Sequence, residues 1–549
     1  MMRLIIPILS LCILTSCTDA SENEINEAPG VTVDELSSYI KELSSDYYLG
    51  RKPFTEGEKR TVKYLVEQCR EIGLAPGNGD KYTQDVPLVE ITGTPDQEMK
   101  VGGKGQDLTF KLKDDYVAFT YREQAEINVE NSEFVFCGFG VVAPEYGWND
   151  FAGMDVKGKT VVVLVNDPGF GSDDPSFFKG NTMTYYGRWT YKYEEAARQG
   201  AEALLIIHET TSAGYPWFVV ESSWSGSALH LRSPDGNKDK AAVQGWITLD
   251  VAKELFEKSG RDLGAEIRKA RTKDFKPFSL GYTMSHRLTN TFKNDVSQNV
   301  VGMIKGTERP DEYIIYSAHW DHLGIGQAVD GDSIYNGAVD NGTGIASLLS
   351  IAEVFAQGSP PARSVLFLFV TAEEQGLLGS QYYAENPIYP TNMTVANLNM
   401  DGMNPFGPMK YLTVTGIGHS ELDEYAEEAA AVQGREILPD QEPEKGYFFR
   451  SDHFNFAKVG IPALYAEGSL EHMEKGRDYV KEQRQGYLDN RYHQPADHYD
   501  PESWDLGGLV QDAKLYYNVG QRLASESTFP QWKDGSEFKA ARAESIMKN

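Results

Sequence analysis

The sequence predicts an α/β protein with a central mixed, largely parallel sheet flanked by helices, and a second, mostly β unit that precedes it. Over about residues 290–525, short apolar runs typical of buried strands alternate with segments of helical periodicity. An earlier region, about 131–267, contains further β-branched runs. The length of 549 residues is enough for three or four domains, so the two units can fold as separate domains.

The composition is that of a globular protein with an acidic surface. Hydrophobic residues make up 40% of the chain and aromatic residues 11%, which suffices for large cores. Lysine and arginine number 52 against 81 aspartates and glutamates, which gives a formal net charge of −29. Because such a surface repels phosphate backbones, we expect no nucleic-acid partner.

The chain begins with the pattern of an export signal. Arg3 precedes the apolar run Leu4–Leu14, which is too short to span a bilayer but has the length of a signal-peptide core. The run leads into Leu14-Thr15-Ser16-Cys17, which resembles the bacterial lipobox, where the cysteine receives a lipid and the leader is cleaved before it. We predict a signal peptide over 1–16, lipidation at Cys17 and a tether over 17–30; the alternative is a secreted protein without the lipid.

This leader predicts an exported lipoprotein of the bacterial cell envelope, facing the periplasm or the cell surface. We expect membrane contact through the N-terminal lipid anchor only, because no later segment is apolar enough to cross a bilayer. Cleavage removes Arg3 and no acid, so −29 becomes −30. Of the four cysteines, Cys12 leaves with the leader, and Cys69 and Cys137 are left as buried thiols or a single bridge.

Residues 31–125 are predicted as an N-terminal helical segment that joins the main domain. Apolar residues recur at spacings of three and four in two stretches, which is the period of a helix with one buried face. These residues are Leu36, Ile40 and Leu43, then Val62, Leu65, Val66 and Cys69. The turn-rich link Leu49–Pro53, which contains Gly50 and Arg51, separates the two helices.

The next two regions supply the strands. The second region contains the predicted strands Glu133–Cys137, Lys159–Val165 and Ala203–Ile207, and the predicted helix Tyr193–Gln199. The third contains the strands Ile314–Ala318, Ser364–Val370 and Val395–Met400, and the helices Ile345–Ala356 and Trp504–Ser525. Strands that alternate with helices in this way favour a layered domain with a largely parallel sheet.

Two nucleotide-binding motifs match by letter but not by context. Gly153–Thr160 fits the phosphate-loop pattern, yet that loop must follow a strand and open a helix, whereas here it runs directly into the strand 159–165. Gly138–Ala143 fits G-x-G-x-x-A, but Pro144 follows at once and no amphipathic helix begins there. We therefore predict no nucleotide site. The motifs H-E-x-x-H and G-x-S-x-G do not occur, which excludes the simplest zincins and serine hydrolases.

Acidic and histidine side chains follow the carboxyl ends of three predicted strands of the third region. Open α/β sheets place such strand ends at one edge, where residues far apart in the sequence converge. The set also includes Asp340, at the start of a predicted helix, and His493, in a predicted loop. Together they are His319, Asp321, His322, Asp340, Glu373, Glu374, Asp401 and His493. Imidazoles with three or four carboxylates are the ligands of a two-metal hydrolytic site.

These residues lie in motifs that resemble those of the di-zinc aminopeptidases, the family typified by bacterial leucyl aminopeptidase and related to aminopeptidase S and glutamate carboxypeptidase. The motifs occur in the family's order. They are Ala318–His322, Asn336–Asn341, Thr371–Ser380, Asn399–Asp401 and His493–Asp497. By this resemblance Asp340 bridges two Zn²⁺ ions, His319 and Asp401 complete one site, and Glu374 and His493 complete the other.

The resemblance also implies the catalytic roles. Glu373 is the general base that takes a proton from a water bridging the two zincs, and Asp321 orients His319. Some members use a tyrosine shortly before a Ser-Asp-His to stabilise the oxyanion. Here Phe448 occupies the nearest equivalent position and Tyr447 lies one residue earlier, so that role stays open.

The second region resembles the protease-associated domain that many of these enzymes carry, through Asp155–Val163 and Lys192–Ala201. We predict this domain over 126–285, the di-zinc catalytic domain with the zinc-exopeptidase fold over 286–530, and a C-terminal tail over 531–549. The function implied is a metal-dependent aminopeptidase acting on peptides. The alternatives are a carboxypeptidase or a glutaminyl cyclase on the same fold, or a non-catalytic binding protein; the oligomeric state stays open.

Overall fold

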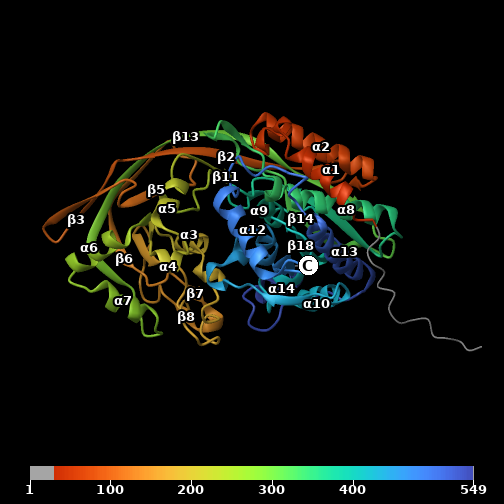
Figure 1. The fold of residues 1–549 in the computed structure, drawn as a ribbon. Helices are drawn as coiled ribbons and strands as arrows, with labels where there is room; N and C mark the ends of the chain where they lie inside the picture. Colours follow the sequence, from red (N-terminus) through yellow and green to blue (C-terminus); the bar gives the residue numbers. More distant parts are fainter. Residues whose placement is uncertain (1–29, 548–549) are drawn as a thin grey trace, which may run out of the picture.

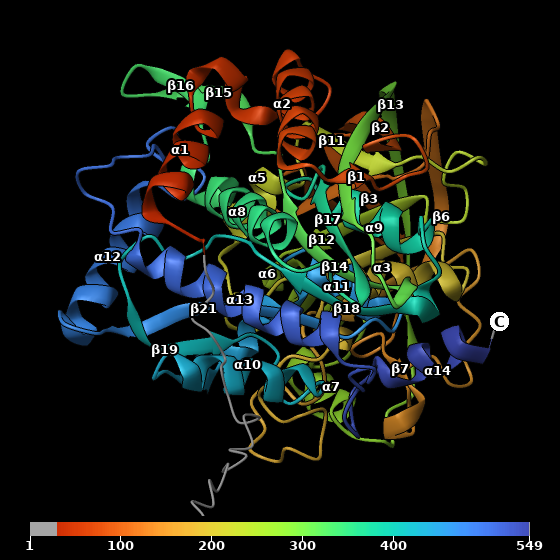
Figure 2. The same ribbon diagram turned by 90° about the vertical axis from the view of Figure 1, so that its right-hand side faces the viewer.

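The computed structural model describes residues 30–547, and its ribbon is drawn in Figures 1 and 2. The predicted signal peptide, Cys17 and nearly all of the tether lie outside the described residues. The α-helices are α1 (Val33–Leu43), α2 (Glu56–Ile72), α3 (Trp189–Arg198), α4 (Thr210–Ala213), α5 (Trp217–Ser223), α6 (Leu249–Lys258), α7 (Leu263–Ala270), α8 (Gly344–Gln357), α9 (Leu378–Glu385), α10 (Leu422–Val432), α11 (His453–Lys458), α12 (Gly476–Asn490), α13 (Gly507–Ser525) and α14 (Lys539–Met547).

The strands fall into a main sheet, a sheet of the second unit and two short hairpins. They are β1 (Ala75–Pro76), β2 (Thr83–Pro95), β3 (Glu98–Gly103), β4 (Gln106–Lys111), β5 (Tyr116–Phe119), β6 (Glu126–Phe136), β7 (Val142–Ala143), β8 (Trp148–Asn149), β9 (Thr160–Leu164), β10 (Ala203–Ile207), β11 (Ser227–Leu231), β12 (Val243–Ile247), β13 (Phe278–Ile304), β14 (Arg309–His319), β15 (Gly324–Val329), β16 (Asp332–Tyr335), β17 (Arg363–Val370), β18 (Thr394–Asn399), β19 (Met409–Val414), β20 (Glu436–Pro439) and β21 (Ala463–His472).

The main sheet is mixed and largely parallel, which confirms the predicted fold class. Strands β17, β14, β18 and β21 lie side by side in parallel. β13 pairs antiparallel with β17 at one side, and β19 pairs antiparallel with β21 at the other and parallel with β20. The parallel strands point their carboxyl ends to the same edge of the sheet, where the predicted ligands follow them.

Both faces of this sheet are buried: every residue of β17 and β18 is buried, and most of these residues are apolar. Side chains of a strand alternate between the two faces, so Ile314 and Tyr316 of β14 pack into one core and Tyr313 and Ile315 into another. The first core is covered by α1, α2, α8 and α13, which lie at the right of Figure 1 and toward the viewer in Figure 2. The second is covered by side chains of α9 and α11.

Helix α13 packs so closely on β14 that only glycine fits at position 520. A Cβ there would lie 1.7 Å from the hydroxyl oxygen of Tyr316, a fully buried side chain that donates to the Tyr516 carbonyl at 2.8 Å. We expect Gly520→Ala to destabilise the fold by about 1–3 kcal/mol through overpacking. Thermal melting checks this, with Gly486→Ala as control.

Gly486 lies in α12, and a Cβ there meets nothing within 4 Å. Alanine should therefore be neutral or stabilise that helix by roughly 0.5–1 kcal/mol. Equal melting temperatures for the two variants would contradict the close packing of α13 on β14.

The second unit contains a parallel sheet of its own. β6, β9, β10 and β12 pair in parallel, and β5 joins antiparallel to β12. The chain Gly153–Thr160 leads directly into β9, and Gly138–Ala143 ends in the short strand β7 followed by a single 3-10 turn, Pro144–Tyr146. Both nucleotide motifs therefore lack the helix that would cradle a phosphate, as predicted.

Strand β13 connects the two sheets, and it is the long strand that arches across the top of Figure 1. Its first part pairs with β6, its middle with β2 and its last five residues with β17. The predicted domain border at 285–286 thus falls inside one unbroken strand. At about 3.3 Å per residue, its 27 residues are long enough to run through both units.

The N-terminal segment 31–125 is helical only in its first part. Helices α1 and α2 bury the predicted residues Leu36, Ile40, Leu43, Val62, Leu65 and Cys69. After them the chain forms β1 to β5, and β5 pairs with β12 of the second unit, because residues 83–119 alternate apolar and polar side chains rather than following a helical period. Cys69 and Cys137 are free, buried thiols. Within residues 30–547, no helix is both long and apolar enough to cross a bilayer.

Candidate metal centre

The predicted ligands converge at the carboxyl edge of the main sheet. His319 is the last residue of β14, Asp401 comes two residues after β18, and Glu373 and Glu374 follow β17 after a short turn. Asp340 lies in the irregular turn Ala338–Thr343 that precedes α8. Because β14, β17 and β18 are adjacent and parallel, their ends lie next to one another.

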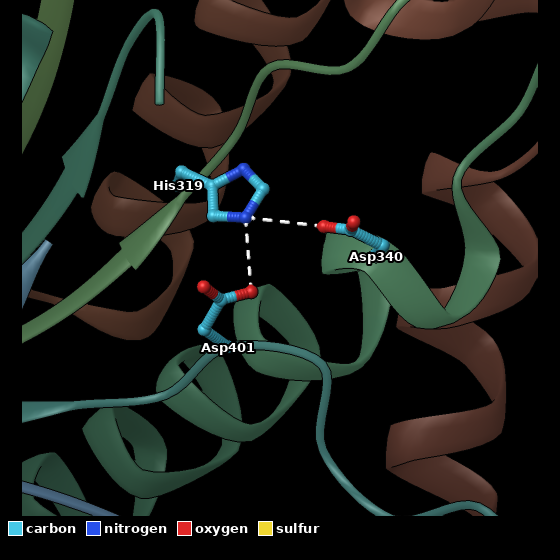
Figure 3. A group of neighbouring side chains, drawn as sticks. All are labelled: His319, Asp340 and Asp401. Atoms are coloured by element: carbon cyan, nitrogen blue, oxygen red, sulfur yellow. Dashed lines mark hydrogen bonds and ion pairs between the residues drawn. The ribbon is translucent and has the colours of Figure 1, made fainter. Parts of the chain in front are cut away.

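One group of ligands is formed by His319, Asp340 and Asp401 (Figure 3). The Nε2 atom of His319 lies 3.2 Å from Oδ1 of Asp340 and 3.1 Å from Oδ1 of Asp401. The three donor atoms all lie within 4.8 Å of one another, so one ion can contact all of them. The imidazole is 1% exposed, which leaves the two carboxylates as the side of the group that faces solvent.

A second group shares Asp340 with the first. His493 Nε2 lies 3.3 Å from the other carboxylate oxygen of Asp340, Oδ2, and 3.2 Å from Oε2 of Glu374. His322 Nδ1 lies 2.5 Å from Oε1 of Glu374, and His322, Asp340 and Glu374 also offer donor atoms within 4.8 Å of one another. Asp340 therefore presents one oxygen to each group.

This donor set fits zinc. Imidazole nitrogens combined with carboxylate oxygens at open positions are typical of catalytic zinc sites. Burial alone would lower the pKa of His319, but the negative charges of Asp401 and Glu373 raise it well above its usual range. Several carboxylates so close together repel one another, and a divalent ion bound between the two groups would neutralise that negative charge.

The neighbouring glutamates Glu373 and Glu374 experience opposite environments. Burial raises the pKa of Glu373, and the nearby negative charges of Asp401 and Glu374 raise it further, well above its usual range. Burial and Asp340 also act to raise the pKa of Glu374, but His322 and His493 outweigh them and hold it at about 2. A carboxylate that stays ionised suits a metal ligand, and one that can take up a proton suits a general base.

The carboxylate of Asp321 holds the chain that carries these glutamates. Its Oδ1 accepts the backbone N–H of Glu373 at 2.9 Å and its Oδ2 that of Glu374 at 3.3 Å. His319 Nδ1 lies 3.9 Å from the Asp321 carboxylate and 3.2 Å from its backbone carbonyl. The ring of His319 is thus oriented by the main chain of Asp321, while the side chain positions Glu373 and Glu374.

Residues 299–517, which contain these ligands, match the model of Peptidase family M28. We call residues 299–517 the M28 segment. It contains every metal ligand predicted from the sequence, from His319 to His493. Similar curated proteins are a probable zinc metalloprotease of Pyrenophora teres f. teres, 35% identical over 102 residues, and the aminopeptidase NAALADL1 of Mus musculus, 35% identical over 130 residues.

These curated matches span 19% and 23% of this chain and only 22% and 16% of the two relatives. Solved structures similar to this chain include an aminopeptidase from Aneurinibacillus sp. strain AM-1 and a zinc aminopeptidase from Bacillus subtilis. Each is 19% identical and covers 92% of this chain, with 96% and 97% of the other chain and TM-scores of 0.49 and 0.41.

The M28 segment also contains site residues to which sequence reasoning gave no role. His322 contacts Glu374, and the Ser451 hydroxyl donates to Oδ2 of Asp401 at 2.5 Å. Asp497 accepts the backbone N–H groups of Val339, at 3.1 and 3.2 Å, and of Asp340, at 3.3 Å. All three residues lie inside motifs singled out in the sequence, but their partners are set by the fold.

Tyr492 contacts a proposed ligand, whereas the interaction of the Tyr447 hydroxyl is with Glu442. The Tyr447 hydroxyl lies 3.5 Å from Glu442. The ring of Tyr492 stacks on that of His493, with centroids 4.0 Å apart. The residue is 44% exposed, but its partial burial, followed by the charges of Asp340 and Glu374, raises the pKa of Tyr492, so its phenol stays neutral beside the acids.

Proposed function

We propose that this protein is a zinc exopeptidase that removes N-terminal residues from peptides. The observation that carries the proposal is the pairing of two ligand groups through the two oxygens of Asp340, with Glu373 beside them. Glu373 Oε2 lies 4.0 Å from His319 Nε2, farther than the 3.1–3.3 Å that separates the imidazoles of His319 and His493 from the carboxylates of the other ligands. That carboxylate is therefore left for proton transfer.

The proposed centre holds two Zn²⁺ ions. His319 and Asp401 would hold one, Glu374 and His493 the other, and Asp340 both. His322 has a different role from His493. Its Nδ1 bonds Oε1 of Glu374, whereas His493 contacts oxygens of both Glu374 and Asp340. His322 thus holds the Glu374 carboxylate in place, as partners behind metal ligands commonly do.

The chain's own residues would carry out the proton transfers. Zinc bound here supplies Lewis acidity toward a water molecule and a peptide carbonyl. Glu373 takes a proton from that water and passes it to the amine that leaves when the peptide bond breaks. Its raised pKa suits this role, because it makes the carboxylate a stronger base toward water than an ordinary glutamate. The neutral phenol of Tyr492 can donate a hydrogen bond to the developing oxyanion.

The remaining parts of the proposal concern location and domain structure. We propose that Cys17 is lipidated after removal of residues 1–16, so that the enzyme is held in the bacterial envelope and acts on peptides there. We propose that the second unit, 126–285, is a protease-associated domain. The parallel strands β6, β9, β10 and β12, with α3 between β9 and β10, support a separate α/β unit placed before the peptidase segment.

Metal removal and a substrate panel test the function. We expect dipeptides with a free amine to be hydrolysed, activity to fall to background on chelation, and Zn²⁺ to restore it, because both proposed steps depend on the metal. The measurement is product release from matched peptides with free and with acetylated N-termini.

If hydrolysis requires a free C-terminus and not a free amine, the enzyme is a carboxypeptidase instead. Release of ammonia from an N-terminal glutamine would identify a cyclase. Metal analysis that finds no bound zinc in active protein would reject the proposal as a whole.

A further inference from the structure

Arg51 is a fully buried arginine that lies behind the metal centre and outside the M28 segment. It belongs to the turn-rich link between α1 and α2, and its side chain is 0% exposed. Gly50 places it there: its φ is 68°, and a Cβ would lie 2.5 Å from the Tyr335 carbonyl and 2.6 Å from that of Gly324. The link therefore lies against the hairpin β15–β16, as only glycine allows.

The guanidinium group of Arg51 binds main-chain carbonyls rather than acids. Nε donates to Trp320 at 2.8 Å, Nη2 to Gly337 at 2.9 Å, and Nη1 to Asn336 at 2.5 Å and to Leu43 at 2.8 Å. Among residues 30–547, no carboxylate lies within ion-pair distance of it. Burying a charge in this way is costly, and such a group is retained where its contacts serve a purpose.

Three of these four carbonyls belong to the two loops that carry metal ligands. Trp320 lies between His319 and Asp321, and Asn336 and Gly337 come four and three residues before Asp340. His319 and Asp340 belong to the same ligand group, 3.2 Å apart. Arg51 therefore ties together the two backbone segments whose separation sets that distance, and Leu43 fixes it to α1.

The positive charge of Arg51 also lies close to the site. Burial lowers the pKa of its guanidinium to about 10, against the opposing effect of Asp340, Asp321 and Asp497, so it stays charged at neutral pH. Arginine alone offers five N–H donors in a rigid planar fork, whereas the three donors of lysine diverge from one nitrogen. Arg51 contacts the Trp320, Asn336 and Gly337 carbonyls from three different nitrogens, which a lysine would have to replace with one.

We propose that Arg51 is a positioning residue for the metal centre: its guanidinium, bonded to the Trp320, Asn336 and Gly337 carbonyls, holds the loops of His319 and Asp340 at the spacing that binds zinc. This inference rests on the proposed zinc function. It implies that the peptidase segment needs the N-terminal link to form its site, although Arg51 lies 268 residues before His319.

The test is the zinc affinity of Arg51→Lys, measured by competition with a chromophoric chelator. Partners behind metal ligands typically change metal affinity by about 10- to 100-fold, and we expect a loss of that size. The absorption spectrum of the Co²⁺-substituted protein should change as well, since it reports ligand geometry. Wild-type protein is measured first: no zinc binding there would reject the proposed function and leave no site for Arg51 to position.

Arg363→Lys is the matched control. Arg363 is also 0% exposed and donates to the Leu523 carbonyl at 2.8 Å, but it begins β17 and so lies at the opposite end of the strand that leads to Glu373. At about 3.3 Å per residue, that is roughly 23 Å away. We expect this variant to lose stability but to keep wild-type zinc affinity and the wild-type Co²⁺ spectrum.

Three results would overturn the proposal. One is wild-type zinc affinity in folded Arg51→Lys, and another is an equal loss of affinity in Arg363→Lys, which would indicate a general effect of destabilisation. Arg51→Gln is the second variant, because it keeps a donor and removes the charge. If neither Arg51 variant folds while Arg363→Lys does, Arg51 holds the fold as a whole rather than the metal centre.

Discussion

Replacement of Glu373 by glutamine should lower kcat for peptide hydrolysis by about 100- to 10,000-fold, the usual contribution of a general base. The reason is that the amide cannot take a proton from water, although it has nearly the same size and shape. Zinc content should stay at the wild-type level, because Glu373 is not among the proposed ligands and its Oε2 lies 4.0 Å from His319 Nε2. Single-turnover rates and metal analysis on the same samples measure both quantities.

Two control variants separate this role from others. Glu385→Gln changes an exposed glutamate of α9 and should leave kcat and zinc content unchanged. Glu374→Gln should instead lower zinc affinity, because Glu374 lies 3.2 Å from His493 and 2.5 Å from His322. A Glu373→Gln protein that cleaves peptides as fast as wild type would falsify the enzyme mechanism proposed here.

The strands of the main sheet could be predicted because burial on both faces makes them continuous apolar runs. β17, predicted as Ser364–Val370, extends over Arg363–Val370, and β18, predicted as Val395–Met400, covers Thr394–Asn399. Strands that are buried on both faces therefore appear in the sequence as mostly apolar runs, whose ends mark the ends of the strands. The convergence of His319, Glu374 and Asp401 then follows from parallel order, since each lies at or just after the end of a strand.

The contacts that hold the ligands in place could not be predicted, because they join residues far apart in the sequence through main-chain groups. Arg51 binds carbonyls 269 to 286 residues away, and Asp497 binds N–H groups more than 150 residues earlier. A carbonyl or N–H is present at every position, so the sequence does not mark which one is the partner. Strand β13 was not predicted for a related reason: its pairing partner changes twice along one extended strand, from β6 to β2 to β17.

Asp340→Asn should affect both zinc ions at once, because Asp340 alone among the proposed ligands belongs to both groups. Asparagine offers one carbonyl oxygen and no charge, so it cannot give an anionic oxygen to each ion. Loss of a partner behind a ligand already costs about 10- to 100-fold in metal affinity, and loss of the shared ligand itself should cost more than about 100-fold at both positions. Activity should fall to background.

The companion variant Asp401→Asn makes this prediction specific. Asp401 lies 3.1 Å from His319 Nε2 and belongs to the first group only. We expect Asp401→Asn to retain about one zinc per chain and Asp340→Asn to retain less than one, as measured by metal analysis after dialysis against a weak chelator. If Asp340→Asn kept two zinc ions with wild-type affinity, the shared carboxylate would not bridge the groups. Equal losses in the two variants would mean that the two ions bind only together, since neither group could then hold its ion alone.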